Sequence, residues 1–160
     1  MRLIIMACSA TKSAAPMPMA ALFRYNGPMW QTLRAQLVRN PSAATDFAVG
    51  DLQIWVLSAL YGFVPASTEI PNYDRRMTPD LVAKMARDPS CDFQRIEHMV
   101  EDADDVLFAG GEMYRDAMWR ASGGHLHNIM KIAETDGRGI GEHRAQLTAW
   151  LDGHYQRLAA

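Results

Sequence analysis

Residues 4–13 read IIMACSATKS, an apolar run that ends abruptly in a thiol, hydroxyl groups and an amine. The apolar run from Leu3 to Ala7 is five residues long, whereas the apolar region of a secretory signal needs roughly 7 to 15. A Walker-type phosphate loop is excluded as well, because it needs glycines before Lys-Ser or Lys-Thr, and here Thr11 precedes Lys12 without a glycine. The pattern instead predicts a buried strand that delivers small polar residues to the end of a sheet, where open α/β proteins bind ligands.

Three more short apolar runs are candidate strands, at 54–60, at 106–109 and, more weakly, at 128–133. Unbroken apolar runs of this length are typical of strands covered on both faces, hence of a mainly parallel sheet. The segments with helical spacing or helix-start signals alternate with these runs, at 29–38, 78–85, 91–100, 110–119 and 147–158. This alternation predicts an α/β fold, a three-layer sandwich with a mainly parallel central sheet, in a single domain spanning 1–160.

Composition sets further bounds on function. With 160 residues, 49% hydrophobic and 21% charged, the chain fits one globular domain with a substantial core. No run approaches the roughly 18 to 20 apolar residues of a membrane-spanning helix, and no targeting segment is visible, so we expect a cytoplasmic protein without a membrane partner. A net charge of -2 argues against a protein that coats nucleic acid and favours a small ligand. No cofactor is predicted, and the sequence leaves the oligomeric state open.

The residues that follow the first predicted strand are the first candidate site. Backbone N–H groups at such a turn, together with hydroxyls and an ammonium, suit a phosphate or a carboxylate, and the residues are Cys8, Ser9, Thr11 and Lys12. The alternative is that they are ordinary turn and capping residues beside a solvated lysine. A nucleophilic Cys8 is not favoured, because no histidine is close in sequence and a thiolate needs an activating neighbour.

The next two strands also end in candidate ligand contacts. Ser58 lies inside the second run, and Tyr61 and Gly62 stand at its exit. The third run ends at Gly110 and Gly111, which permit close backbone approach and open a helix whose first turn can hold an anion. The alternatives are that Tyr61 only covers the core with its hydroxyl in water, and that the glycine pair is a plain helix entry.

The loop PNYDRR, residues 71–76, combines an aromatic ring, a carboxylate and two cations. A base can stack on Tyr73, Asp74 can contact the edge of the base or assist chemistry at the sugar, and arginines can bind phosphate. The alternative is an ordinary solvated loop.

Two further patterns give weaker signals. Residues 136–144, DGRGIGEHR, resemble another glycine-rich helix entry, although they are not a dinucleotide-binding fingerprint. His125 and His127 have the same-side spacing of a strand, but no third ligand is identifiable, so no metal site is predicted.

Taken together, these motifs resemble a family of small bacterial and phage proteins with C-S-x-T-K, L-S-A-x-Y-G and G-I-G-x elements, related to the YaaA-like peroxide-stress proteins and the lyase-type module of archaeosine synthase. The motifs that carry the resemblance are CSATK (8–12), LSALYGFV (57–64), YD (73–74), AGGEMY (109–114), GIGEH (139–143) and LTAWL (147–151). The ligand pocket that the resemblance implies consists of Cys8, Ser9, Thr11, Lys12, Ser58, Tyr61, Gly62, Tyr73, Asp74, Gly110, Gly111, Tyr114, Gly139 and Gly141.

The resemblance implies a function connected with DNA or modified nucleobases. We therefore expect an enzyme that acts on a nucleotide, nucleoside or modified base, with cleavage or transfer at the N-glycosidic bond, including DNA base glycosylase-like activity. Asp74 or Glu69 would stabilise oxocarbenium-like charge or activate water, Tyr73 would stack the base, and Lys12 would hold phosphate. The alternative is a non-catalytic nucleotide or nucleic-acid binding module of a stress or phage-defence system. The chain shows no evident DNA-binding helical hairpin, which speaks against duplex DNA.

Overall fold

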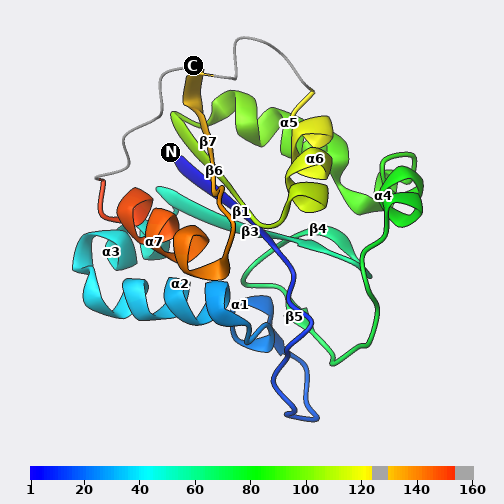
Figure 1. The fold of residues 1–160 in the computed structure, drawn as a ribbon, viewed down its shortest axis with the longest axis horizontal. Helices are drawn as coiled ribbons and strands as arrows, with labels where there is room; N and C mark the ends of the chain where they lie inside the picture. Colours follow the sequence, from blue (N-terminus) through cyan, green and yellow to red (C-terminus); the bar gives the residue numbers. More distant parts are fainter. Residues whose placement is uncertain (124–129, 154–160) are drawn as a thin grey trace.

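The computed structural model describes residues 1–123 and 130–153. Within these residues, five strands form a central sheet in the order β4-β3-β1-β6-β7 (Figure 1). All neighbouring strands pair in parallel except β4, which is antiparallel to β3. The strands are β1 (Arg2–Ala7), β3 (Leu52–Ser58), β4 (Gly62–Pro65), β6 (Asp105–Ala109) and β7 (Ile132–Glu134). The expected mainly parallel sheet is therefore confirmed.

Both faces of the sheet are covered, which explains the unbroken apolar run of β1. Leu3 and Ile5 belong to one hydrophobic cluster, Ile4 and Met6 to a second, and all four are fully buried. The helices α4 (Pro79–Met85), α5 (Phe93–Asp102) and α6 (Glu112–Ala121) and the short 3-10 helix η1 (Pro89–Cys91) pack against the first cluster. The helices that pack against the second cluster are α1 (Ala21–Arg24), α2 (Pro28–Arg39), α3 (Pro41–Val49) and α7 (Ile140–Leu151).

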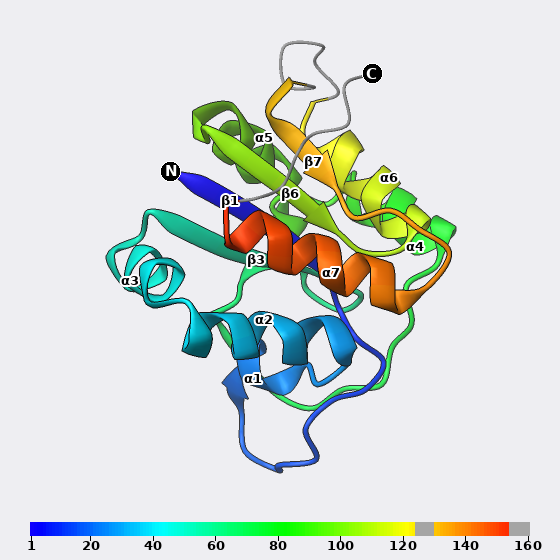
Figure 2. The ribbon, with the colours of Figure 1, turned by 60° about the vertical axis from the view of Figure 1, so that its left-hand side comes forward.

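Figure 2 shows α7 and α2 side by side over this second face. The three-layer α/β sandwich in a single domain is thus confirmed. Within the described residues, no helix is long and apolar enough to cross a membrane.

The order of the strands creates a switch point between β1 and β6. From β1 the chain crosses to β3 on one side, whereas from β6 it crosses to β7 on the other side. The two connections diverge at this point and leave a crevice outside the carboxyl ends of β1 and β6. In open α/β sheets this crevice is where ligands bind.

Most helix boundaries follow the local signals in the sequence. Thr78 caps α4 by accepting a hydrogen bond from the Leu81 backbone N–H at 3.2 Å, and Pro79 occupies the first turn, as predicted. Asn40-Pro41 ends α2, but it also starts α3 at once, because the Asn40 side chain accepts a hydrogen bond from Ala43 N–H.

Three predicted segments have different limits in the structure. The helix expected over 91–100 begins after Asp92, a residue in the left-handed conformation (φ 59°) that separates α5 from η1. The weak strand expected over 128–133 overlaps β7, although residues 124–129 lie outside the described part. The last predicted helix, whose apolar stripe covers 147–158, begins at Ile140, at the glycine-rich helix entry expected over 136–144, and residue 158 lies outside the described residues.

A buried arginine holds the proline-containing loop that follows β1. Two short strands, β2 (Met19–Ala20) and β5 (Glu69–Ile70), form a separate antiparallel pair beside this loop. The Arg24 side chain is fully buried and donates hydrogen bonds at 2.6–2.9 Å to the carbonyl oxygens of Ser13, Ala15 and Met17. A buried charge satisfied by several carbonyl groups fixes the path of the chain after the first strand.

Gly62 owes its identity to the fold, and its replacement tests this assignment. Its φ is +70°, and an added Cβ would lie 2.6 Å from Cys91 Cβ. We therefore expect Gly62→Ala to lower the free energy of unfolding by at least about 2 kcal/mol in urea titrations, from backbone strain and overpacking together. Gly50→Ala is the matched control, because Gly50 has a φ of +89° but an added Cβ would meet only Gln53 Nε2, at an ordinary contact distance of 3.5 Å. Equal losses in the two variants would contradict the packing role of Gly62.

Candidate functional site

A cavity of about 450 Å³ lies at the switch point, outside the carboxyl ends of β1 and β6. Its wall includes Ala7 and Cys8 from the end of β1 and Ala109 and Gly110 from the end of β6. This volume falls within the range of roughly 300 to 1,000 Å³ that is typical of small-molecule sites. Position and size together make the cavity the candidate ligand site.

Three helices begin at this cavity with a glycine at the N-cap. The glycines are Gly27 before α2, Gly111 before α6 and Gly139 before α7, and all three line the cavity. None of the three helices has a side-chain hydrogen bond at its cap. First-turn N–H groups that no side chain caps, and the positive ends of the helix dipoles, therefore surround one space, an arrangement that favours an anion.

The glycines around the cavity have two different physical explanations. At Gly27 and Gly110 an added Cβ would lie 2.2 Å from Ser9 Oγ and 2.7 Å from Ala7 Cβ, so close packing requires glycine. At Gly111 and Gly139 an added Cβ would meet no atom within 4 Å, and neither residue has a positive φ. The fold would accept a side chain there, and the missing side chain keeps the helix ends open to a ligand.

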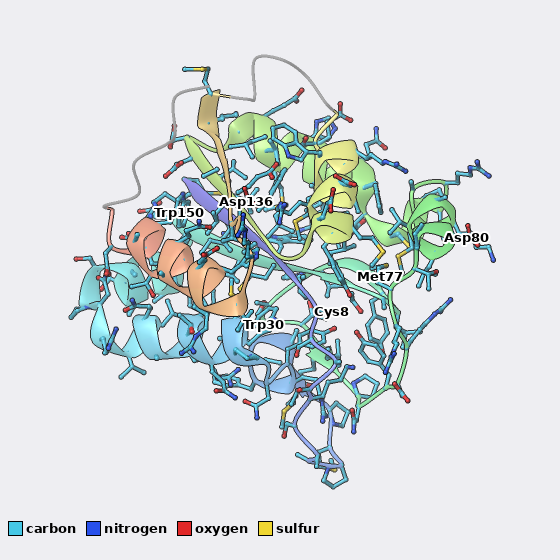
Figure 3. All side chains as sticks on the ribbon, in the orientation of Figure 1. Cys8, Trp30, Met77, Asp80, Asp136 and Trp150 are labelled. Atoms are coloured by element: carbon cyan, nitrogen blue, oxygen red, sulfur yellow. The ribbon has the colours of Figure 1, made fainter. Side chains whose placement is uncertain are left out.

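Cys8 connects this cavity to a cluster of tyrosines beside it. The thiol lies 3.2 Å from the Tyr114 hydroxyl, and Tyr114 also lines the cavity. Cys8 packs against both hydrophobic clusters of the sheet, and Figure 3 shows it between Trp30 and Met77, which belong to opposite clusters. The thiol therefore stands at the end of β1 where the two layers of helices meet the cavity.

Tyr73 is the centre of the neighbouring cluster. Its hydroxyl lies 2.9 Å from Ser58 Oγ and 2.6 Å from the Tyr25 hydroxyl. The Lys12 ammonium lies over the Tyr73 ring, 4.4 Å from its centroid, and the Tyr61 ring contacts Tyr73 edge-on at 5.7 Å. Four residues that the sequence marked as candidates are thus brought together, in a polar and aromatic cluster that adjoins the cavity.

Burial changes the titration of three tyrosines along this line. Burial, with the Cys8 thiol as second cause, raises the pKa of Tyr73 to about 12. Burial raises the pKa of Tyr25 well above the ordinary value, and the neighbouring Tyr73 adds to this shift. Burial likewise raises the pKa of Tyr114, and the neighbouring Cys8 adds to it. The three phenols remain protonated at neutral pH and act as hydrogen-bonding groups.

A histidine that sequence analysis did not select also lines the cavity. His143 Nδ1 lies 2.9 Å from Oγ1 of the fully buried Thr135, and Thr135 Oγ1 accepts a hydrogen bond from Gly110 N–H at 3.2 Å. His143 follows the helix cap Gly139 by four residues, which places both on one face of the helix entry. That spacing was the signal in the sequence that could have identified it.

The structure divides the predicted site residues into three groups. Those lining the cavity are Cys8, Ser9, Gly110, Gly111, Tyr114 and Gly139. Those forming the adjoining cluster are Lys12, Ser58, Tyr61 and Tyr73. Five predicted residues lie in neither group. Thr11 is exposed, Gly62 packs against Cys91, and Gly141 lies in the groove between α7 and α2. The other two are the carboxylates Glu69 and Asp74.

Both predicted carboxylates are exposed and lie outside the cavity wall. Glu69 belongs to β5, and Asp74 follows Tyr73 in the loop after that strand. Within the described residues, no group of three His, Cys, Asp or Glu side chains is arranged to hold a metal ion. His125 and His127 lie outside the described residues.

No family model, curated protein or solved structure matches the chain. The likeness to YaaA-like proteins and to archaeosine synthase, carried by motifs such as the CSATK sequence from Cys8 to Lys12, therefore stays a prediction. The cavity and the tyrosine cluster are findings of the structure itself.

The raised pKa of Tyr73 predicts a loss of stability in alkali. Because the pKa of Tyr73 is raised in the folded state, the unfolded chain loses this proton first, and the free energy of unfolding falls as the pH rises from about 10 to 12. Urea titrations across this pH range should show that the free energy of unfolding falls less steeply with pH in Tyr73→Phe than in the parent. The difference in slope should correspond to the release of up to about one proton on unfolding. An unchanged pH dependence in the variant would show that Tyr73 titrates alike in both states.

Proposed function

We propose that the cavity binds the phosphate of a nucleotide or phosphorylated nucleoside, and that the protein is an enzyme acting on that nucleotide or its base. The observation that carries the proposal is the convergence of three uncapped helix N-termini, at Gly27, Gly111 and Gly139, on one cavity at the switch point. Several helix ends facing one space stabilise a dianionic group without any lysine in the wall.

The remaining wall suits an organic ring attached to the phosphate. Met29, Trp30, Ile140 and Tyr114 give the cavity apolar and aromatic surface, and His143 adds a polar group that can recognise a ring substituent or an oxygen. Arg138 stands at the same wall and is exposed, so its guanidinium can approach a phosphate from the solvent side. A phosphate with a heterocycle fits this combination better than a purely ionic or a purely apolar ligand.

The chemical part of the proposal depends on residues outside the cavity wall. N-glycosidic cleavage requires a group that stabilises positive charge at the sugar, usually a carboxylate. Among the described residues, the wall contains no Asp or Glu, which favours the non-catalytic binding module as the second candidate. Of the two predicted carboxylates, Asp74 is the nearer in sequence to the tyrosine cluster, because it directly follows Tyr73. The Tyr73 ring lies under the Lys12 ammonium.

Calorimetry with four nucleosides and their 5′-monophosphates tests the binding proposal. We expect the monophosphates to bind at least about tenfold more tightly than the nucleosides, because only they carry the dianion. Gly111→Asp should weaken monophosphate binding at least about tenfold more than Gly111→Asn, since the two side chains have the same shape and differ in charge. Both variants should keep the melting temperature, because Asp and Asn are good N-cap residues and Gly111 has open space.

Thr78→Asp is the matched control, because it places the same charge at a helix N-cap away from the cavity. It should leave monophosphate affinity unchanged. Equal binding by nucleosides and monophosphates, or equal affinities of the Gly111→Asp and Gly111→Asn variants, would contradict a phosphate site at these helix ends.

Asp74→Asn tests the catalytic part, because it keeps the shape of the side chain and removes its charge. On a substrate whose base is released, we expect turnover to fall at least about a hundredfold, or about 2.7 kcal/mol of transition-state stabilisation, with ligand affinity and melting temperature nearly unchanged. Release of free base at the parent rate would contradict the role of Asp74, and Glu69→Gln would then be the variant to measure. Binding without turnover across the panel would favour the non-catalytic alternative.

A further inference from the structure

The buried Thr135 and the partly buried His143 form a hydrogen-bonded pair at the edge of the cavity. Thr135 follows β7, its side chain is fully buried, and His143 lies in the second turn of α7. The Thr135 hydroxyl oxygen lies 3.2 Å from Gly110 N and 2.9 Å from His143 Nδ1. One hydroxyl thus connects the end of β6 to the histidine in the cavity wall.

Counting donors and acceptors fixes the direction of these hydrogen bonds. Gly110 N–H can only donate, so Thr135 Oγ1 accepts it. Within the described residues, the Thr135 hydroxyl hydrogen has no acceptor other than His143 Nδ1. If Nδ1 donated instead, a buried hydroxyl hydrogen would be left without a partner, which is costly. The arrangement that satisfies every group has Thr135 donating to Nδ1, and the neutral imidazole then carries its hydrogen on Nε2.

The Nε2–H group is the part of His143 that remains available to a ligand. His143 lines the cavity together with the helix caps Gly111 and Gly139, and within the described residues Nε2 has no hydrogen-bond partner. An N–H donor beside uncapped helix ends complements an oxygen acceptor, such as a phosphate oxygen.

Gly110 is itself held from two sides, so the pair is anchored to rigid elements. Arg115 donates to the Gly110 carbonyl oxygen at 2.8 Å, and the Arg115 side chain is paired with Glu134 at 3.0 Å. Close packing against Ala7 holds the Gly110 backbone from a further side. The histidine is thereby held in a defined orientation.

We propose that His143 donates a hydrogen bond from Nε2 to an oxygen of the ligand's phosphate, and that Thr135 is the positioning residue that fixes the tautomer. This inference rests on the proposed phosphate site. It adds the side chain that contacts the ligand and the residue that orients it.

The first test measures the tautomer without any ligand. Long-range ¹⁵N–¹H correlation spectra at a pH near 9, where histidine side chains are ordinarily neutral, should show the His143 hydrogen on Nε2. Thr135→Val has nearly the same shape without the hydroxyl and should lose this tautomer preference, whereas Thr135→Ser should keep it. A hydrogen on Nδ1 in the parent protein, or an unchanged preference in Thr135→Val, would overturn the role of Thr135.

The second test measures binding of inorganic phosphate and the four nucleoside 5′-monophosphates. His143→Ala should weaken both kinds of probe at least about tenfold, and His143→Gln should retain most of the affinity, because the glutamine amide places an N–H group near the position of Nε2. Melting temperatures of the two variants identify any loss that comes from folding.

The possible results separate this inference from the proposed function. If His143→Ala binds as tightly as the parent while Gly111→Asp loses binding, the role of His143 is overturned and the phosphate site stands. If the parent binds neither inorganic phosphate nor a monophosphate, both proposals are overturned.

Discussion

The close approach of β1 and β6 at Ala7 and Gly110 is the constraint on which the rest of the site depends. An added Cβ at Gly110 would lie 2.7 Å from Ala7 Cβ, so the two strand ends can meet only because Gly110 has no side chain. Both residues of this contact line the cavity at the switch point. The contact also brings the Gly110 backbone within reach of two side chains: Thr135 accepts a hydrogen bond from its N–H, and Arg115 donates one to its carbonyl oxygen.

The helix ends around the cavity lack the side-chain caps that α3 and α4 have. Serine, aspartate or asparagine at these N-caps would stabilise each helix by only about a few tenths of a kcal/mol relative to glycine, and the side chain would accept a hydrogen bond from a first-turn N–H group. Gly111 and Gly139 have the space for such side chains, yet both are glycine. By contrast, Thr78 and Asn40 cap α4 and α3, which begin away from the cavity. Uncapped ends that face one cavity are the arrangement expected when a ligand supplies the missing acceptors.

Cys8 and the tyrosines connect the cavity to the loop after β5. The Cys8 thiol contacts Tyr114 in the cavity wall, and Tyr73 connects Ser58 and Tyr25 beneath the Lys12 ammonium. Lys12, predicted as a direct phosphate ligand, therefore lies in this cluster and outside the cavity wall. The hydrogen bonds among these tyrosine hydroxyls and the Cys8 thiol restrict the positions that neighbouring residues can take. This network is the physical route by which a residue of the 71–76 loop could be held near a ligand.

The sequence by itself determined the features that depend on short stretches of chain. The apolar run before Cys8, the Thr78-Pro79 start and the Gly110-Gly111 entry identify a buried strand and two helices, because backbone preferences and burial act locally. Only the tertiary structure decided which side chains meet. It packed Gly62 against Cys91 and it placed His143 in the same wall as Cys8. Such meetings depend on strand order and on the packing of the layers, so residues far apart in the chain give no local signal of them.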